Sequence, residues 1–169
     1  MWRIDHGLMR RVHRWPAPRW VRVWMLASTR AGDGWLWAVL GIFLLVLGGE
    51  TSVSAVGAAT SAAILSIVLF LLLKRVFNRR RPCELEAHCW ATLMPPDEFS
   101  FPSGHTMVSF AAMVPLSLFY PQLLWTLLFC ALSIAISRIV LGMHFLTDVI
   151  AGALLGSALG LWAYLLFSP

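Results

Sequence analysis

The chain has 169 residues, of which 59% are hydrophobic and 12% are charged, and its formal net charge is +5. A soluble domain of this size lacks the surface to carry such a composition, so we expect one membrane domain over residues 1–169. The cations are mostly arginines beside tryptophans near the N-terminus, which fits a membrane bilayer as partner and not a nucleic acid.

Residues 1–30 contain seven arginines and are divided by Pro16 and Pro18. Arginines this frequent prevent either half from crossing a bilayer. We therefore expect a helix, a break and a second helix that lie in the membrane interface, with Trp15, Trp20 and Trp24 at the boundary between lipid and water.

Five apolar stretches within residues 34–167 are predicted to form transmembrane helices: 34–49, 51–73, 104–120, 123–139 and 145–167. The first is short, because sixteen residues reach only about 24 Å as a helix. Residues 75–102 are polar and rich in proline, and they are predicted to be a loop. The predicted fold class is all-α: a polytopic membrane helix bundle of about five transmembrane helices plus an N-terminal interfacial amphipathic segment.

The positions of the glycines and cysteines give two further expectations. Gly152, Gly156 and Gly160 follow one another at steps of four, which predicts close packing of the last helix against a neighbour. Cys83 and Cys89 share the loop and could form a disulfide if the loop faces an oxidising compartment, whereas Cys130 lies in an apolar run and is expected to pack.

Ionisable side chains are scarce in the C-terminal part of the chain. The 71 residues after Glu98 contain two formally charged side chains and two histidines, namely Arg138, Asp148, His105 and His144. Ionisable groups in membrane-spanning sequence cost free energy, and they usually persist because they pair or have a function.

His144 and Asp148 are four residues apart, so on a helix they would lie on the same face and could hydrogen-bond directly. A carboxylate on one imidazole nitrogen fixes the tautomer and leaves the other nitrogen as a basic lone pair. This arrangement prepares a nucleophile or a general base. The alternative is a buried ion pair without a reactive role.

Ser103, Gly104 and His105 follow Pro102 at the predicted start of a helix, where free N–H groups and the helix dipole attract anions. Gly104 would let an oxyanion approach the backbone, Ser103 could cap the helix and donate its hydroxyl, and His105 would supply a proton. The string is predicted to bind a phosphate.

Three cations complete the candidate site. Arg138 stands alone among nearly forty uncharged residues, Arg81 is followed by Pro82, and Lys74 is the only lysine. Arginine matches phosphate oxygens with a planar fork, and lysine acts as a mobile point charge. For Lys74, Arg75, Arg79 and Arg80 taken singly, a solvated or headgroup-binding loop is the favoured interpretation. Alternation of the spans brings all these strings to one membrane face.

Three short segments carry these side chains: residues 74–82, 102–105 and 137–148. They resemble the three signature motifs of the type 2 phosphatidic acid phosphatase superfamily, and residues 53–167 bear the resemblance. The resemblance implies a helical bundle in which residues 75–102 form the active-site loop. It implies that His144 forms a phosphohistidine, that Asp148 orients His144, and that His105 protonates the leaving oxygen. It further implies a phosphate site made by Lys74, Arg81, Ser103, Gly104 and Arg138, with no metal and no other cofactor.

The N-terminus departs from the pattern, because many membrane members of the superfamily have six spans. The compact build resembles that of small bacterial undecaprenyl pyrophosphate phosphatases and lipid A 1-phosphatases. We therefore expect a lipid phosphate substrate, with undecaprenyl pyrophosphate as the leading candidate. Phosphatidylglycerol phosphate, phosphatidic acid and lipid A 1-phosphate are alternatives. A non-enzymatic lipid or anion transporter is the alternative of another class. The superfamily also contains vanadium-dependent haloperoxidases, but these are soluble, so the apolar composition of this chain argues against that function.

Two arguments about membrane orientation oppose each other. Arginine counting places residues 1–30 and 74–81 on the cytoplasmic side. The family resemblance implies a bacterial inner-membrane protein whose active site faces the periplasm or the exterior. Positive charge at a phosphate site has a functional cause, so we favour the outer face.

Overall fold

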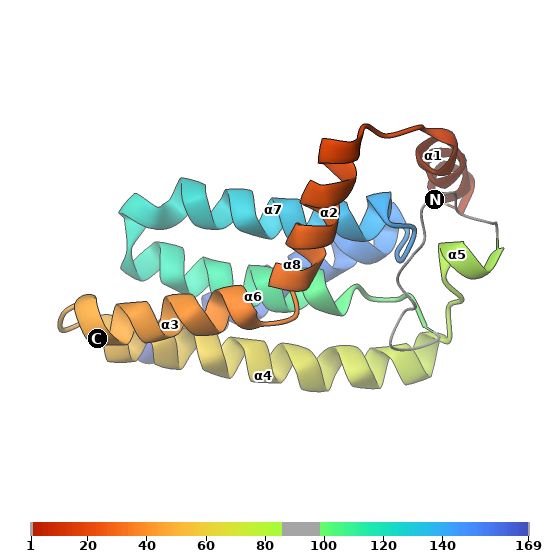
Figure 1. The fold of residues 1–169 in the computed structure, drawn as a ribbon. Coiled ribbons are helices and arrows are strands. Elements are labelled where there is room, and N and C mark those ends of the chain that lie inside the picture. The colour runs from red at the N-terminus through yellow and green to blue at the C-terminus, as the bar shows by residue number, and fades with distance from the viewer. Residues whose placement is uncertain (1, 86–98, 169) are drawn as a thin grey trace.

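The computed structural model describes residues 2–85 and 99–168, and Figure 1 shows their arrangement. In these ranges regular structure is helical, apart from an isolated bridge between Arg80 and Phe99. The elements in chain order are α1 (Trp2–Arg14), α2 (Arg19–Ala31), α3 (Trp35–Leu47), α4 (Ser52–Phe77), α5 (Pro82–Leu85), α6 (Gly104–Phe119), η1 (Pro121–Leu123), α7 (Leu124–Val140) and α8 (Leu146–Phe167).

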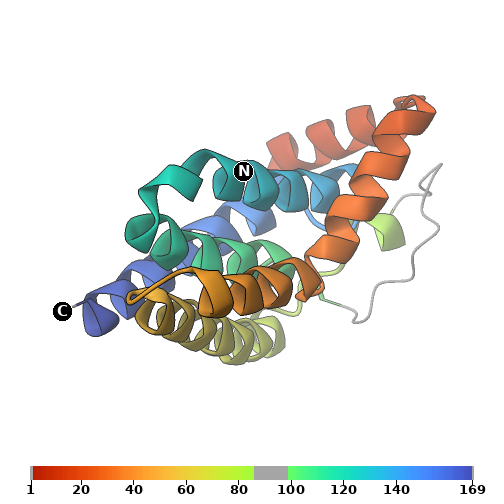
Figure 2. The ribbon, with the colours of Figure 1, turned by 60° about the vertical axis from the view of Figure 1, so that its left-hand side comes forward.

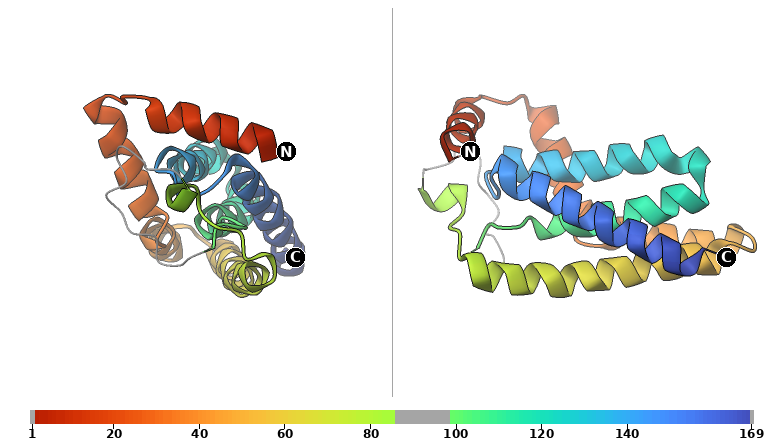
Figure 3. Two further views of the ribbon diagram at one scale, coloured as in Figure 1. Left: turned by 90° about the vertical axis from the view of Figure 1, so that its right-hand side faces the viewer. Right: turned by 180° about the vertical axis from the view of Figure 1, so that it is seen from behind.

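The long helices α4, α6, α7 and α8 run lengthwise beside one another, and α6 contacts each of the other three (Figure 2). The end-on view in Figure 3 shows α1 lying across the bundle and α2 descending along one side toward α3. The fold is a helical membrane bundle, as the sequence predicts. The predicted division into an interfacial segment and a bundle stays a prediction.

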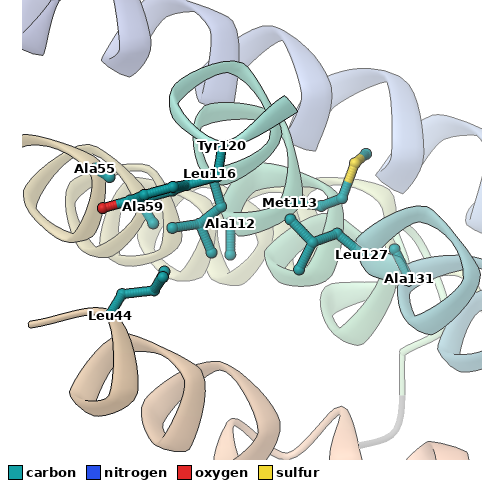
Figure 4. Close-up of a cluster of buried hydrophobic side chains, with 9 residues drawn as sticks. All are labelled: Leu44, Ala55, Ala59, Ala112, Met113, Leu116, Tyr120, Leu127 and Ala131. Atoms are coloured by element: carbon teal, nitrogen blue, oxygen red, sulfur yellow. The ribbon is translucent and has the colours of Figure 1, made fainter. Parts of the chain in front are cut away.

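The core of the bundle is made largely of small and flexible apolar side chains. Figure 4 shows one cluster between α3, α4, α6 and α7, which comprises Leu44, Ala55, Ala59, Ala112, Met113, Leu116, Tyr120, Leu127 and Ala131. Large apolar side chains point outward instead: Trp125 is 77% exposed and Val53 is 72% exposed. Because lipid tails solvate such surfaces, this distribution fits a bilayer.

The five predicted spans correspond to α3, α4, α6, α7 and α8, and their ends fall within a few residues of the prediction. Among the described residues, three helical segments are long and apolar enough to cross a bilayer alone: α4, α8, and α7 together with η1. Helices α2 and α3 pass the same test only as a pair bent by 60°, and α6 has 16 residues.

The glycine stripe on α8 packs against the backbone of α6, as predicted. A Cβ atom at Gly152 would lie 2.7 Å from the Ser103 carbonyl oxygen, and one at Gly160 would lie 2.7 Å from that of Ala111. Gly156 meets the Met107 carbonyl in the same way. The stripe therefore lets α6 and α8 approach at backbone distance.

The N-terminal segment forms two helices separated at Pro16 and Pro18, as expected. Helix α2 contacts α7, and Met25 is buried in a small cluster with Met143 from the loop after α7. Placement of these helices at the membrane interface stays a prediction. The proposed Cys83–Cys89 disulfide involves Cys89, which lies outside the described residues.

Candidate active site

A cavity of about 290 Å³ opens at the end of the bundle where α4 ends and α6 begins. Six of the eight predicted site residues line it: Lys74, Arg81, Gly104, His105, Arg138 and His144. Ser103 and Asp148 are fully buried beside the cavity. Residues up to 70 positions apart in the sequence therefore converge on one space.

His144 lies in the loop between α7 and α8, and only 2% of it is exposed. Its Nδ1 is 2.6 Å from the backbone carbonyl oxygen of Ser100. A carbonyl only accepts hydrogen bonds, so Nδ1 carries the proton and Nε2 holds the free lone pair. Nε2 lies 3.3 Å from Nη1 of Arg81. The ring is thus fixed in the tautomer whose basic nitrogen faces a cation of the cavity.

The surroundings also set the charge of His144. Burial, together with the positive charges of the three cations that line the cavity, holds the pKa of His144 well below its usual range. The imidazole is therefore neutral at neutral pH, which is the form that has a nucleophilic lone pair.

The expected hydrogen bond between His144 and Asp148 is not formed. Nδ1 of His144 is 3.8 Å from Oδ2 of Asp148, which is too long. The expectation was wrong because α8 begins at Leu146, so His144 precedes the helix and lacks the geometry of a helical i,i+4 pair. Oδ2 of Asp148 instead accepts the backbone N–H of Phe145 at 2.9 Å. Asp148 thus fixes the start of α8, two residues after His144.

Arg79 joins Asp148 to the N-terminal helix. Its Nη1 lies 2.6 Å from Oδ1 of Asp148 and 2.7 Å from the hydroxyl of Thr147, and its Nη2 lies 2.7 Å from Oδ2 of Asp5. Asp5 also accepts hydrogen bonds from the hydroxyl and the backbone N–H of Thr147. Arg79 is therefore part of a partly buried network, and the predicted solvated or headgroup-binding loop does not describe it.

Arg81 is 1% exposed and supports the loop that carries His144. Its Nη1 donates to the carbonyl of Met143 at 2.8 Å. The backbone N–H of Cys83 donates to the carbonyl of Gly142, two residues before His144. The segment after α4 is therefore tied to the loop that places the histidine.

The other two cations approach from different helices. Arg138, 3% exposed near the end of α7, donates to the hydroxyl of Thr29 on α2. Lys74, near the end of α4, is 7% exposed, and its Nζ lies 5.2 Å from the centre of the Phe70 ring. Charged groups this deeply buried favour an anionic ligand in the cavity.

Helix α6 begins at the cavity with Gly104 and His105. Ser103 directly precedes α6, but its side chain makes no capping hydrogen bond to the helix backbone. The Ser103 hydroxyl instead lies 3.0 Å from the hydroxyl of Thr106. The predicted cap is therefore absent. A Cβ at Gly104 would lie 3.1 Å from the Phe70 ring, so glycine lets this ring pack closely against the start of α6. His105 contacts Asp33 from the turn between α2 and α3.

Sequence reasoning missed several residues of the site, namely Asp5, Thr29, Asp33, Arg79 and the carbonyl of Ser100. A weak signal existed for two of them: Asp33 is the acidic residue that precedes the first span, and Arg79 lies between Lys74 and Arg81. Nothing local in the sequence marked the others.

Known proteins with similar sequences include two that are named as phosphatases of lipid substrates. An undecaprenyl-diphosphatase of Sulfolobus acidocaldarius is 28% identical over 134 residues, which are 79% of this chain and 64% of that protein. A lipid A 1-phosphatase of Rhizobium johnstonii is 30% identical over 109 residues, which are 62% of this chain and 45% of that protein. The chain spans less than two thirds of the length of these relatives.

The fold is also similar to a solved structure. The crystal structure of Aquifex aeolicus LpxE matches with a TM-score of 0.78 and 29% sequence identity, covering 95% of this chain and 94% of that one. The family model described as PAP2 superfamily matches residues 53–169, which include every helix from α4 to α8. The chain is an integral membrane protein, and it belongs to the PAP2 superfamily.

Proposed function

We propose that the protein is a lipid phosphatase that removes the terminal phosphate of a membrane lipid phosphate or pyrophosphate without a metal ion. His144 attacks the phosphorus atom, His105 protonates the leaving oxygen, and water then hydrolyses the phosphohistidine. The single observation that carries the proposal is the placement of the His144 ring: Nδ1 lies 2.6 Å from the Ser100 carbonyl oxygen, and Nε2 lies 3.3 Å from Nη1 of Arg81.

The cavity supports a phosphate ligand. Lys74, Arg81 and Arg138 supply three positive charges around it, and the first turn of α6 presents backbone N–H groups. These groups stabilise the negative charge that spreads over the equatorial oxygens during phosphoryl transfer. In this proposal Ser103 and Asp148 act by placing α6 and α8.

A second cavity supports a lipid as the remainder of the substrate. It has a volume of about 270 Å³ and lies between α3, α4 and α6, with an almost wholly apolar lining. Ile67 lines both this cavity and the polar one. A phosphate in the polar cavity could therefore continue into a hydrocarbon chain along α4 without crossing water.

Undecaprenyl pyrophosphate, converted to undecaprenyl phosphate, is the substrate we favour. The relative from Sulfolobus is named for that activity, and it aligns with 79% of this chain. Lipid A 1-phosphate is the first alternative because of the Rhizobium relative, and phosphatidylglycerol phosphate and phosphatidic acid are further alternatives. A transporter that reuses the phosphate cavity would not need a histidine held in one tautomer.

We further propose that the active site faces the periplasm or the exterior of a bacterial inner membrane. Cys83 lies in α5, at the polar end of the bundle, and gives a test. An impermeant thiol reagent applied to reduced intact cells should label it, with a Cys83→Ser variant as the control for other cysteines. Labelling only after permeabilisation would contradict this orientation.

Release of inorganic phosphate by the purified full chain tests the enzymatic proposal. The four candidate lipids are assayed side by side, for the wild type and for His144→Ala. The proposal expects phosphate release that depends on His144, with the highest kcat/KM on undecaprenyl pyrophosphate. Absence of phosphate release from all four lipids, or equal release by His144→Ala, would contradict it.

A further inference from the structure

Asp33 contacts the ring of His105. Its Oδ1 lies 2.7 Å from Nε2, and both residues line the polar cavity. Asp33 is 55% exposed and the His105 side chain is 21% exposed, so the pair lies at the mouth of the cavity. The two residues are 72 positions apart in the sequence.

The turn between α2 and α3 is shaped to make this contact. Gly34 has a φ of +111°, a conformation that favours glycine, and it follows Asp33 directly. A Cβ at Gly32 would lie 2.9 Å from Cδ2 of His105 and 2.8 Å from Cγ2 of Ile134. Glycine at position 32 therefore lets the turn lie close to Cδ2 of the imidazole, while Asp33 contacts Nε2 of the same ring.

Charge gives this contact a chemical role. Among the described residues that line the cavity, Asp33 is the one carboxylate, and it faces three cations, Lys74, Arg81 and Arg138. Those cations oppose a positive charge on His105, yet a proton donor must carry its extra proton when the leaving oxygen departs. A carboxylate on one ring nitrogen stabilises the imidazolium form and fixes the orientation of the ring.

We propose that Asp33 is a positioning residue for the reaction, which orients His105 and keeps it able to donate a proton. The inference rests on the proposed function. Asp33 lies outside residues 53–169, so the family match does not assign it a role.

Protons and bonds are conserved over the two steps of the proposed reaction. Nε2 of His144 forms a bond to phosphorus as the bond from phosphorus to the leaving oxygen breaks, and that oxygen takes a proton from His105. Water then attacks the phosphorus atom as the bond from phosphorus to Nε2 of His144 breaks. One proton of the water passes to His105, and inorganic phosphate leaves. Asp33 exchanges no proton in either step.

The test compares substrates whose leaving groups differ. The alkoxide of a lipid monophosphate is a poor leaving group that needs a proton, whereas the phosphate that leaves from a lipid pyrophosphate is stable without one. Asp33→Asn should lower kcat on a monophosphate about tenfold or more and kcat on a pyrophosphate about threefold or less. KM should change to the same extent for both substrates.

Three further variants separate positioning from a structural role. Asp33→Glu keeps the carboxylate and should recover part of the lost rate on the monophosphate. Asp33→Asn combined with His105→Asn should be no slower than His105→Asn alone, because the effect of Asp33 passes through His105. Glu50→Gln removes the same charge from the opposite end of α3 and should change neither rate.

Equal losses on the two substrates, no loss on either, or an additional loss in the double variant would each overturn the role of Asp33. Failure of the proposed function has a different signature, because the wild type itself would then release no phosphate from either lipid.

Discussion

The bundle from α4 to α8 and the N-terminal segment from α1 to α3 contribute to the site in different ways. The bundle lies within the family match and carries Lys74, His105, Arg138 and His144. The N-terminal segment lies outside that match, yet three of its side chains contact residues of the site: Asp5, Thr29 and Asp33.

The difference separates groups that react from groups that position them. Each of these three residues contacts a side chain of the bundle: Asp5 contacts Arg79, Thr29 contacts Arg138, and Asp33 contacts His105. Positioning contacts act through orientation and local charge, so their loss should lower the rate less than the loss of a reacting group does. We therefore expect graded effects, with the largest in the bundle and the smallest in α1.

The largest effect is expected for His144→Ala. Loss of the nucleophile should lower kcat by about a thousandfold or more, since no nearby side chain can replace the attacking nitrogen. Initial rates of phosphate release measure it, with circular dichroism and gel filtration to verify folding. Retention of a tenth of the wild-type rate would show that His144 is not the nucleophile. It would also contradict the assignment of the reacting group to the bundle.

Arg138→Ala should rank next, because it removes one of three cations that hold the phosphate. We expect a loss of about 2–4 kcal/mol in transition-state stabilisation, which corresponds to roughly thirtyfold to a thousandfold in kcat/KM. Inhibition by orthovanadate, which imitates the five-coordinate transition state, should disappear.

Arg30→Ala, an exposed arginine on α2, is the matched control and should leave vanadate inhibition unchanged. Thr29→Val removes only the hydroxyl that Arg138 contacts, so its effect should be smaller than that of Arg138→Ala. An equal effect of the two variants would show that the N-terminal segment is as essential as the bundle.

Asp148→Asn tests a positioning residue that belongs to the bundle itself. Because Nδ1 of His144 is held by the Ser100 carbonyl and lies 3.8 Å from Asp148, the tautomer should survive this change. We expect a loss of about tenfold to a hundredfold in kcat, through the weaker hold on Arg79 and the start of α8. A loss as large as that of His144→Ala would mean that Asp148 contacts the histidine directly during the reaction.

Asp5→Asn should affect stability more than turnover. Burial raises the pKa of Asp5, but hydrogen bonds from Arg79 and Thr147 outweigh it, so the pKa lies below its usual 3.8. The stabilisation is therefore present above pH 3.8 and is lost as the pH falls through the lowered value. The variant should lose about 1–2 kcal/mol at neutral pH.

Thermal unfolding in detergent measures this loss at neutral pH and below pH 3.8, where the difference from the wild type should shrink. A difference that persists at the lowest pH would contradict the ionic origin of the contact.

Treatment with EDTA should have the smallest effect, namely none. The proposed chemistry places positive charge on the phosphate through Lys74, Arg81 and Arg138, so no metal ion is needed. Rates after prolonged chelation, with and without added magnesium, measure this. Loss of activity that magnesium restores would contradict the proposed chemistry.

The sequence predicted the bundle well and the contacts between its parts poorly. Apolar stretches and prolines located α4, α6, α7 and α8, because a bilayer imposes long uncharged helices. Alternation of those helices also predicted one common end for the strings that hold Lys74, His105, Arg138 and His144.

The rest depends on contacts that leave no local pattern. Asp5 meets Thr147 across 142 positions, and Asp33 meets His105 across 72. The pairing of His144 with Asp148 was wrong because their spacing suits a helix, whereas α8 starts only after His144. The true partner of Nδ1 is a backbone carbonyl, and every residue has one, so residue type carries no signal.

The most direct test of the central claim is to identify the residue that becomes phosphorylated during turnover. The full chain is mixed with a lipid pyrophosphate that carries a radiolabelled terminal phosphate, quenched in alkali to preserve phosphohistidine, digested and analysed by mass spectrometry. We predict label on the peptide that contains His144 in the wild type and no label in His144→Ala. Label on another residue, or turnover by His144→Ala, would contradict the account.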